Sequence, residues 1–232
     1  MENSNPYHVA IILDGNRRFA KRLMLEPWKG HEYGAEKVEK LLDYLKELGI
    51  KQLTLYCLST ENLKRPKHEL DYLLNVFRKE FDNLSKKENR EKLDLNGIKI
   101  KFIGNLDLLP KDLEEKCKKL EKQTEKNFQY IVNFAIAYGG KLELIHMIKN
   151  IVKNTKNPEE VNEELIKKNL YLQDEPDLII RTGGEKRTSN FLPWQSAYSE
   201  WFFLDKFWPE FDKNDLVSCI EEFKNRKRNF GK

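Results

Sequence analysis

The stretch that decides the fold is HVAIILDGNRRFAKR, residues 8–22. Its first six residues are typical of a short buried strand, which runs directly into Asp-Gly-Asn and then into a helix-forming stretch with four basic side chains. Where a strand ends and a helix begins, free backbone N–H groups and the positive end of the helix dipole favour the binding of a phosphate group. Gly15 lets the backbone approach such a ligand, and Arg17 and Arg18 supply charge-assisted hydrogen bonds. The stretch therefore predicts a phosphate-facing turn in an α/β sheet.

Asp14 is the exception in this stretch, because a bare carboxylate would repel a phosphate. Its presence is explained if a divalent cation lies between the two, since hard cations bind carboxylate and phosphate oxygens together. The alternative is an ordinary strand-to-helix turn without a ligand, because short motifs also occur by chance. From residues 8–22 alone both interpretations remain open.

The amino-acid composition limits the classes of protein to which this chain can belong. A chain of 232 residues with 39% hydrophobic and 11% aromatic residues has enough apolar material for a globular core. The 42 basic and 38 acidic residues give a mixed charge of +4, which gives little support for nucleic-acid binding. The cysteines lack CxxC spacing, which indicates structural thiols in a reducing compartment. No signal peptide or run of about 20 apolar residues occurs, so we expect a cytoplasmic protein.

Strand and helix patterns alternate along the whole chain. After the first strand, further strands are predicted at residues 52–58, 98–102, 129–135, 177–181 and 201–204. Helices are predicted at residues 38–48, 70–84, 110–126, from 140 onward, 153–168 and 212–226. This alternation predicts a mostly parallel central sheet flanked by helices on both faces. No repeat or low-complexity linker is visible, so we expect a single domain over residues 1–232.

Polar clusters follow three of the predicted strands, at residues 14–18, 59–65 and 181–189. Ligands of parallel sheets bind outside the carboxyl ends of the strands, so the three clusters are expected to converge. They combine arginines, small hydroxyls and glycines with one well-placed carboxylate. The glycine–lysine loop of P-loop NTPases, the Gly-x-Gly-x-x-Gly fingerprint, the nucleophile elbow and an Asp-Asp-x-x-Asp motif are all absent. The pattern favours a site for one or two diphosphates with a metal.

With these motifs in order, the chain resembles the cis-prenyltransferases, the family of undecaprenyl and dehydrodolichyl diphosphate synthases. The resemblance covers nearly the whole chain. It rests on HVAIILDGN with Arg18 at residues 8–18, GH at 30–31, LYCLSTENLKRP at 55–66, NFAIAYGG at 133–140 and DLIIRTGGEKRTSNFLPWQSAYSE at 177–200. The resemblance implies an α/β fold with a hydrophobic tunnel for the isoprenoid chain. It also implies a reaction in which an allylic diphosphate ionises, isopentenyl diphosphate attacks, and loss of a proton leaves a cis double bond.

The resemblance also implies roles for individual residues. Asp14 would bind Mg²⁺ and help the diphosphate leave, and Glu200 matches the second metal carboxylate of the family. Asn62 would relay the proton in the last step, with Ser59 orienting it; because an amide is a poor base, the departing diphosphate is an alternative acceptor. Arg181 and Arg187 would hold isopentenyl diphosphate, together with Ser189. The residues expected at the substrates are Gly15, Asn16, Arg17, Arg18, Phe19, His31, Ser59, Thr60, Glu61, Leu63, Arg65, Arg181, Arg187, Thr188 and Ser189.

Several positions depart from the family pattern. Pro27 stands where the family commonly has arginine, so that phosphate contact is either missing or supplied by Arg22 or Lys29. The C-terminal Arg-x-Gly of the family reads NFG at residues 229–231. The charged run at residues 86–92 looks like extra length after the tunnel helix at 70–84. Charged extensions here go with longer products in the family, so the resemblance implies a medium-to-long product. The other interpretation of this run is a solvated helix end.

The resemblance leaves alternatives. His31 and Arg65 could instead have structural roles, as a hydrogen-bonded histidine and a loop cap. The whole chain could be a non-catalytic partner subunit of a heteromeric synthase, or more remotely an RNA- or phosphate-binding module. The presence of Asp14, Asn62 and Arg181 favours an active enzyme using Mg²⁺, isopentenyl diphosphate and an allylic diphosphate of farnesyl or geranylgeranyl type. We expect a homodimer, and the lipid product leaves peripheral contact with a membrane open.

Overall fold

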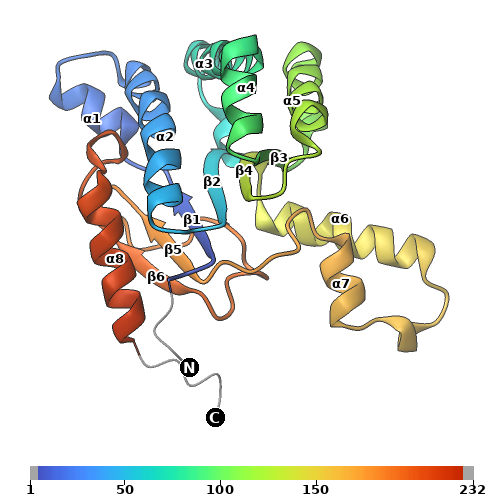
Figure 1. The fold of residues 1–232 in the computed structure, drawn as a ribbon. Coiled ribbons are helices and arrows are strands. Elements are labelled where there is room, and N and C mark those ends of the chain that lie inside the picture. The colour runs from blue at the N-terminus through green and yellow to red at the C-terminus, as the bar shows by residue number, and fades with distance from the viewer. Residues whose placement is uncertain (1–4, 227–232) are drawn as a thin grey trace.

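The computed structural model describes residues 5–226, and its centre is a six-stranded sheet in the order β3-β4-β2-β1-β5-β6 (Figure 1). All five pairs of neighbouring strands are parallel. The strands are β1 (His8–Ile12), β2 (Gln52–Ser59), β3 (Ile98–Ile103), β4 (Tyr130–Tyr138), β5 (Leu178–Arg181) and β6 (Glu200–Phe203). The predicted α/β sheet is confirmed, and it is entirely parallel.

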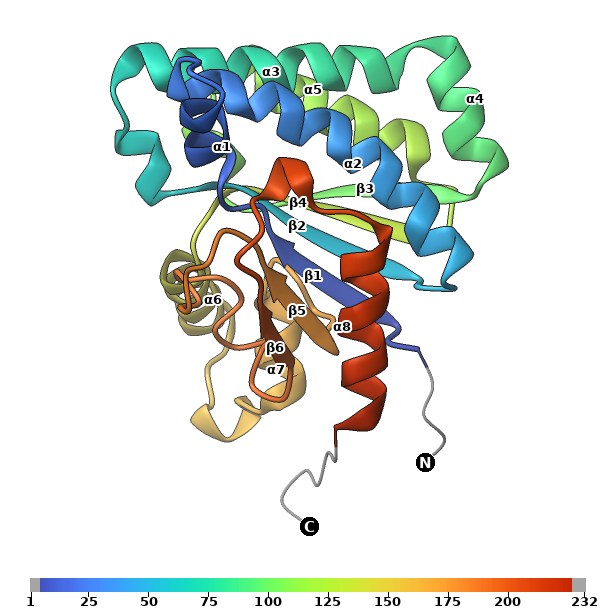
Figure 2. The ribbon, with the colours of Figure 1, turned by 90° about the vertical axis from the view of Figure 1, so that its left-hand side faces the viewer.

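Helices cover both faces of this sheet. They are α1 (Asn16–Arg22), α2 (Gly30–Glu47), α3 (Lys67–Ser85), α4 (Lys87–Leu95), α5 (Lys111–Thr124), α6 (Gly140–Asn154), α7 (Glu163–Asn169) and α8 (Lys213–Asn225). Figure 2 shows α2 to α5 above the sheet and α6 and α7 below it. The larger apolar core joins one face of the sheet to α2, α3, α4, α5 and α8. A smaller cluster fills the other face beneath Phe191 and Leu192, and a third joins α6 to α7.

Two predicted helices differ in the structure. The polar segment 153–168 is not one helix, because α6 continues to Asn154 and a separate short helix, α7, begins at Glu163. The charged run at 86–92 does not continue α3: Lys86 is extended, with ψ of 145°, and a new helix, α4, follows. Leu93 of this new helix is only 6% exposed, so α4 packs its apolar side chain against the core and is more than a solvated end.

A ladder of polar side chains crosses the buried sheet. His8 of β1 lies with Nε2 2.8 Å from the Thr54 hydroxyl of β2, and Asn133 of β4 donates to the same oxygen at 2.9 Å. All three side chains are at most 1% exposed. Burial lowers the pKa of His8 to about 4, although Asp174 and Asp177 oppose the shift. The imidazole is therefore neutral in the folded protein at physiological pH.

The order of the strands places a crevice at the middle of the sheet. The chain goes from β1 to β2 on one side and returns to β5 on the other side of β1. In open parallel sheets, ligands bind outside the carboxyl ends of the strands at such a reversal. Ile12 of β1 is in register with Arg181 of β5, so Asp14 and the 181–189 segment emerge together. Among residues 5–226, no helix is long and apolar enough to span a membrane.

The buried His8 predicts how stability depends on pH. Its pKa of about 4 in the folded state lies below the value of 6.5 expected on unfolding. The unfolded chain therefore binds more protons between these values, and stability falls as the pH drops from 6.5 to 4. One such proton contributes a slope of about 1.4 kcal/mol per pH unit. The free energy of unfolding, measured in urea at each pH from 4 to 7, should depend less steeply on pH for His8→Gln than for wild type. The difference in slope should correspond to about one proton. An unchanged slope would contradict the buried neutral imidazole.

Candidate active site

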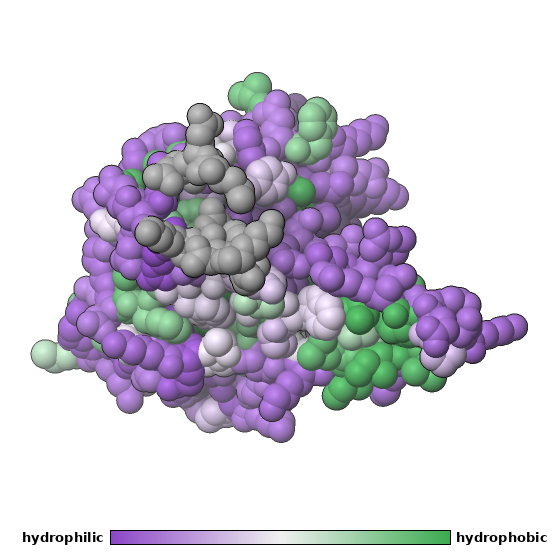
Figure 3. Space-filling view, turned by 90° about the horizontal axis from the view of Figure 1, so that it is seen from below, coloured by the Kyte–Doolittle hydropathy of each residue, from purple (hydrophilic) through white to green (hydrophobic). Residues whose placement is uncertain are grey.

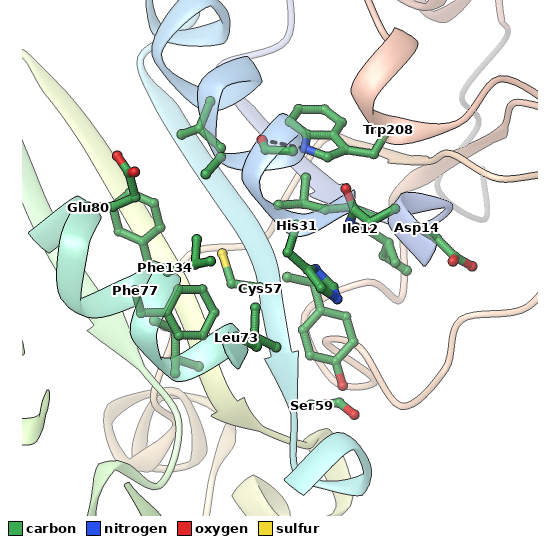
Figure 4. Close-up of a pocket in the computed structure, with 18 of the residues that line it drawn as sticks. Ile12, Asp14, His31, Cys57, Ser59, Leu73, Phe77, Glu80, Phe134 and Trp208 are labelled. Atoms are coloured by element: carbon green, nitrogen blue, oxygen red, sulfur yellow. Dashed lines mark hydrogen bonds between the residues drawn. The ribbon is translucent and has the colours of Figure 1, made fainter. Parts of the chain in front are cut away.

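A cavity of about 590 Å³ runs from the carboxyl ends of the strands between α2, α3 and the sheet. Figure 4 shows Leu73 and Phe77 of α3 facing Phe134 and Cys57, while Asp14 and Ser59 lie toward the strand ends. The apolar walls are formed by Ile12, Leu13, Val38, Leu42, Leu73, Val76, Phe77, Phe81, Leu84, Leu93, Ile98, Ile100, Val132, Phe134 and Ile136. The cavity is an apolar tunnel with a polar mouth, and the predicted stripe on α3 is one of its walls.

Asp14 is held at the mouth by its neighbours on three segments. Its Oδ1 accepts from the Gly15 backbone N–H at 2.6 Å and from Arg18 at 3.2 Å, and its Oδ2 accepts from Arg181 at 2.8 Å. Its backbone carbonyl accepts from the Thr182 hydroxyl at 2.7 Å and from the backbone N–H of Trp208 at 3.0 Å. The carboxylate side chain is still 29% exposed. It is fixed in place and remains accessible from the cavity.

Arg181 joins the first polar cluster to the third. Its side chain is 4% exposed, and besides Asp14 it donates to the Ser189 hydroxyl at 2.7 Å and to the Arg187 carbonyl at 2.5 Å. Its buried Nε has no hydrogen-bond partner within residues 5–226. A planar guanidinium can bind several oxygens at once, and this fork sets the position of the loop that carries Arg187.

The second group of charges surrounds His31 on α2. Nη1 of Arg65 lies 3.4 Å from His31 Nε2, and Arg17 forms an ion pair with Glu69 at 3.1 Å. Burial, and then the charges of Arg65 and Arg17, lower the pKa of His31 to about 4. The ring is therefore neutral and its Nε2 accepts from Arg65. The arginines at this edge create a positive field suited to a polyanion.

The segment after β2 supplies short polar groups. The Ser59 hydroxyl accepts from the Asn62 backbone N–H at 3.1 Å, which fixes the turn that carries Asn62. Glu61 accepts from the Thr60 hydroxyl at 3.2 Å and from Asn190 at 3.0 Å. Burial raises the pKa of Glu61, but hydrogen bonds from its own backbone N–H and from Asn190, Ser59 and Thr60 outweigh it and lower the pKa overall. Glu61 is therefore a hydrogen-bonded carboxylate.

The structure brings most of the predicted residues together. Those that line the cavity are Asp14, Asn16, His31, Ser59, Glu61, Asn62, Arg65, Arg181, Arg187 and Ser189. Gly15, Arg17, Arg18, Thr60 and Thr188 lie in the same three segments without lining it. Phe19 packs edge-on against Tyr33 at 5.4 Å, and Leu63 packs against the core.

The structure does not bring Glu200 to Asp14 within one chain. Glu200 begins β6 in register with Leu178, whereas Asp14 follows the end of β1. Its carboxylate accepts from Arg226 at 2.7 Å. Parallel strands put their first and last residues at opposite edges of the sheet, so the two carboxylates lie apart. The predicted pair of metal ligands is therefore not assembled by a single chain.

Among the described residues, the Asp14 carboxylate is placed where a magnesium ion would fit. Mg²⁺ in phosphate sites is commonly bound through one or two carboxylates and the phosphates of the substrate. Asp14 offers a part-exposed carboxylate beside the arginines that would hold those phosphates. Within residues 5–226, no group of three or more histidine, cysteine, aspartate or glutamate side chains is placed to hold a metal ion.

Several residues at the site were not predicted to have a role there. Tyr56 and Trp208 line the cavity, and Thr182 and Asn190 position the loops. Thr182 and Asn190 stand within the quoted 177–200 motif, so their place in it was the available signal. Arg22, expected to replace the arginine missing at Pro27, instead pairs with Glu210 at 2.5 Å. The segment 229–231 lies outside the described residues.

The role of Arg181 can be tested with inorganic pyrophosphate as the probe. The single ammonium of a lysine cannot reproduce the guanidinium fork, in which one nitrogen donates to Asp14 and the other to Ser189 and the Arg187 carbonyl. Arg181→Lys should therefore weaken pyrophosphate binding about tenfold by calorimetry. Arg226→Lys is the matched control, since Arg226 pairs with Glu200 and Glu222. Equal affinity for the wild type and Arg181→Lys would contradict the assignment.

The comparisons with known proteins agree with this geometry. The family model described as "Putative undecaprenyl diphosphate synthase" matches residues 12–231. The chain is 45% identical to the tritrans,polycis-undecaprenyl-diphosphate synthase (geranylgeranyl-diphosphate specific) of Methanopyrus kandleri, over 100% of this chain and 86% of that protein. The protein of the same name from Pyrococcus abyssi is 44% identical, over 98% of this chain and 87% of its own.

Two solved structures share the fold. The crystal structure of "a probable undecaprenyl diphosphate synthase" from Campylobacter jejuni has a TM-score of 0.82 and 34% identity, covering 99% of this chain and 100% of that one. Lavandulyl diphosphate synthase from Lavandula x intermedia, in complex with dimethylallyl diphosphate, has a TM-score of 0.89 and 28% identity, covering 98% and 99%. The chain belongs to the undecaprenyl diphosphate synthase family, the cis-prenyltransferases.

Proposed function

We propose that this chain elongates a geranylgeranyl-type allylic diphosphate with isopentenyl diphosphate by successive cis condensations and releases diphosphate at each step. The observation that carries the proposal is the position of the arginine-lined mouth at one end of an apolar cavity of about 590 Å³. A prenyl diphosphate has the same division into a charged head and an apolar tail. The names of the relatives in Methanopyrus and Pyrococcus support a geranylgeranyl rather than a farnesyl primer.

The two groups of basic side chains provide one position for each diphosphate. His31 and Arg65 line the cavity from which the apolar tunnel extends, and Arg18 pairs with Asp14 at its mouth, so the three suit the allylic substrate. Arg187 and Ser189 lie together with Arg181 and suit isopentenyl diphosphate.

The side chains also support an order of chemical events. Asp14 would hold Mg²⁺, which neutralises the charge that develops on a departing diphosphate. The apolar walls exclude water from the allylic carbon, which favours attack by isopentenyl diphosphate over hydrolysis. Asn62, on the turn fixed by Ser59, would relay the proton that leaves in the last step, with the departing diphosphate as its acceptor.

The depth of the cavity bears on product length. Its walls continue past the α3 stripe to Leu93 of α4 and Ile98 of β3, which lie far from Asp14 along the sheet. The segment that forms α4 is the charged run from which a medium-to-long product was predicted. We propose such a product, a polyprenyl diphosphate of the kind from which lipid glycan carriers are made.

An active enzyme is favoured over the alternatives. A non-catalytic partner subunit has no need of Asp14, Asn62 and Arg181 around one cavity, yet all three line it. An RNA-binding module leaves the apolar tunnel without a purpose. Contact of the chain with a membrane is consistent with a lipid product and stays a proposal.

Turnover of labelled isopentenyl diphosphate tests the proposal directly. With geranylgeranyl diphosphate and Mg²⁺, the wild type should give labelled products that carry many added units. Asp14→Ala should lower kcat by about 100-fold or more, because it removes charge stabilisation of the leaving diphosphate. Chelation of the metal should have a similar effect.

The matched control is Asp43→Ala, which removes an exposed carboxylate of α2. Thin-layer analysis reports the product length. Turnover unaffected by Asp14→Ala would exclude the metal role, and products that stop after one or two additions would exclude a medium-to-long chain. No turnover by the purified wild type would favour the partner-subunit interpretation.

A homodimer is supported by an apolar stripe on α6. Ile145, Ile148 and Val152 are spaced by three and four residues, so they share one face of the helix. They are 48%, 53% and 73% exposed. Figure 3 shows a hydrophobic area where Figure 1 places α6 and α7. An exposed apolar stripe of this kind marks an interaction surface, and a second copy of the chain would cover it symmetrically.

The stripe gives a prediction about assembly. The double substitution Ile148→Asp and Val152→Asp should convert a dimer into a monomer in light-scattering measurements, because burying two carboxylates in the interface is costly. Phe128→Asp changes a residue that is 83% exposed at the α5–β4 turn and serves as the control. A wild-type monomer, or a dimer that survives the double substitution, would contradict this interface.

A further inference from the structure

Asn190 lies in an unusual stretch of backbone beside the cavity. Ser189 and Asn190 have φ of 49° and 63°, and Leu192 has φ of 49°. Left-handed backbone is unfavourable for residues other than glycine, and asparagine tolerates it best among them. Three such residues in four positions persist only where surrounding contacts hold them. The contacts of Asn190 are therefore informative.

Asn190 uses its side-chain amide and its backbone carbonyl to tie the 181–189 loop to two other segments. Its backbone carbonyl accepts from the Gly140 N–H at 2.8 Å, and its Oδ1 accepts from the Lys141 N–H at 2.8 Å, at the first turn of α6. Its Nδ2 donates to Glu61 Oε1 at 3.0 Å. One side chain thus spans from the end of β4 to the segment after β2.

The three segments meet too closely for a larger side chain between them. A Cβ added at Gly139 would lie 2.5 Å from the Thr60 hydroxyl oxygen and 3.0 Å from Asn190 Nδ2. Tyr56 supports the junction from below, since its ring stacks on Phe191 at 4.6 Å. The backbone at this junction is therefore closely packed, and the Asn190–Glu61 hydrogen bond lies at its exposed edge.

The sequence neighbours of the two partners are the residues assigned to chemistry. Glu61 precedes Asn62, and Asn190 follows Ser189, whose hydroxyl accepts from Arg181. The hydrogen bond from Asn190 to Glu61 therefore connects the segment that carries the proton relay to the loop that would hold isopentenyl diphosphate.

We propose that Asn190 is a positioning residue that sets the distance between the two substrate half-sites through its hydrogen bond to Glu61. The inference rests on the proposed function and adds a residue to it. Each half-site keeps its own arginines when this bond is broken, so binding of each substrate changes little. The rate of condensation falls, because reacting groups displaced by about 1 Å can lose a factor of about 100.

Exchanging the amide of Asn190 and the carboxylate of Glu61 tests this hydrogen bond separately from the other contacts of the two residues. Asn190→Asp keeps the acceptor for Lys141 and tolerates the same backbone, but it places a second carboxylate against Glu61. Glu61→Gln removes the charge and still accepts from Asn190. In the double variant, the amide introduced at position 61 donates to the carboxylate introduced at position 190, so the bond is restored with its direction reversed.

Kinetics with isopentenyl diphosphate and geranylgeranyl diphosphate should separate the variants. We expect Asn190→Asp to lower kcat by about 10- to 100-fold with both KM values within about threefold of wild type. The kcat of the double variant should be at least about tenfold higher than that of Asn190→Asp. Asn162→Asp is the matched control, because Asn162 caps α7 through its side chain far from the cavity.

The outcomes distinguish this inference from the proposed function. If the wild type forms polyprenyl products but the double variant remains as slow as Asn190→Asp, the coupling role is overturned and the function stands. A rise in KM for isopentenyl diphosphate with kcat unchanged would also overturn it, since Asn190 would then serve binding alone. A wild type without turnover contradicts the proposed function first. Thermal unfolding of each variant checks that the fold is retained.

Discussion

The ion pair between Asp14 and Arg181 is the interaction on which the rest of the site depends. Arg181 is the last residue of β5, and Asp14 follows the end of β1, the parallel strand beside it. The order of strands reverses at this point of the sheet. Arg181 is buried, and a buried guanidinium is tolerated only when it is paired and hydrogen-bonded. The carboxylate of Asp14, the hydroxyl of Ser189 and the carbonyl of Arg187 meet this requirement. One contact between the pair therefore fixes both the candidate metal ligand and the candidate phosphate-binding loop.

The arrangement around this pair separates charge from apolar surface along the sheet. The arginines gather where parallel strands end, while the strand interiors and α3 form an apolar wall. His31 is neutral because it lies buried among cations, so it adds a hydrogen-bond acceptor without adding repulsion. A substrate with a charged head and an apolar tail can lie in such a cavity in one direction only.

The sequence predicted the sheet and the convergence of the three polar clusters, because the carboxyl ends of parallel strands share one edge. It could not predict the position of Glu200, which depends on where β6 begins relative to β5. The sequence also did not reveal the break between α3 and α4 at Lys86. The charged run after Lys86 has a helix-forming composition, whether it extends α3 or begins a new helix. Asn190 was visible within a motif, but its role depends on contacts with Glu61 and α6 that only the folded chain brings together.

The short helix α4 has a consequence for how such proteins diversify. Leu93 contributes the far wall of the cavity from a nine-residue helix that begins after an extended residue, and this helix carries none of the groups that bind Asp14 or Arg181. A substitution there changes the space available to the tail without disturbing the arginines at the mouth. On the proposed function, natural selection could therefore alter the length of the lipid while the groups that carry out each addition are inherited unchanged.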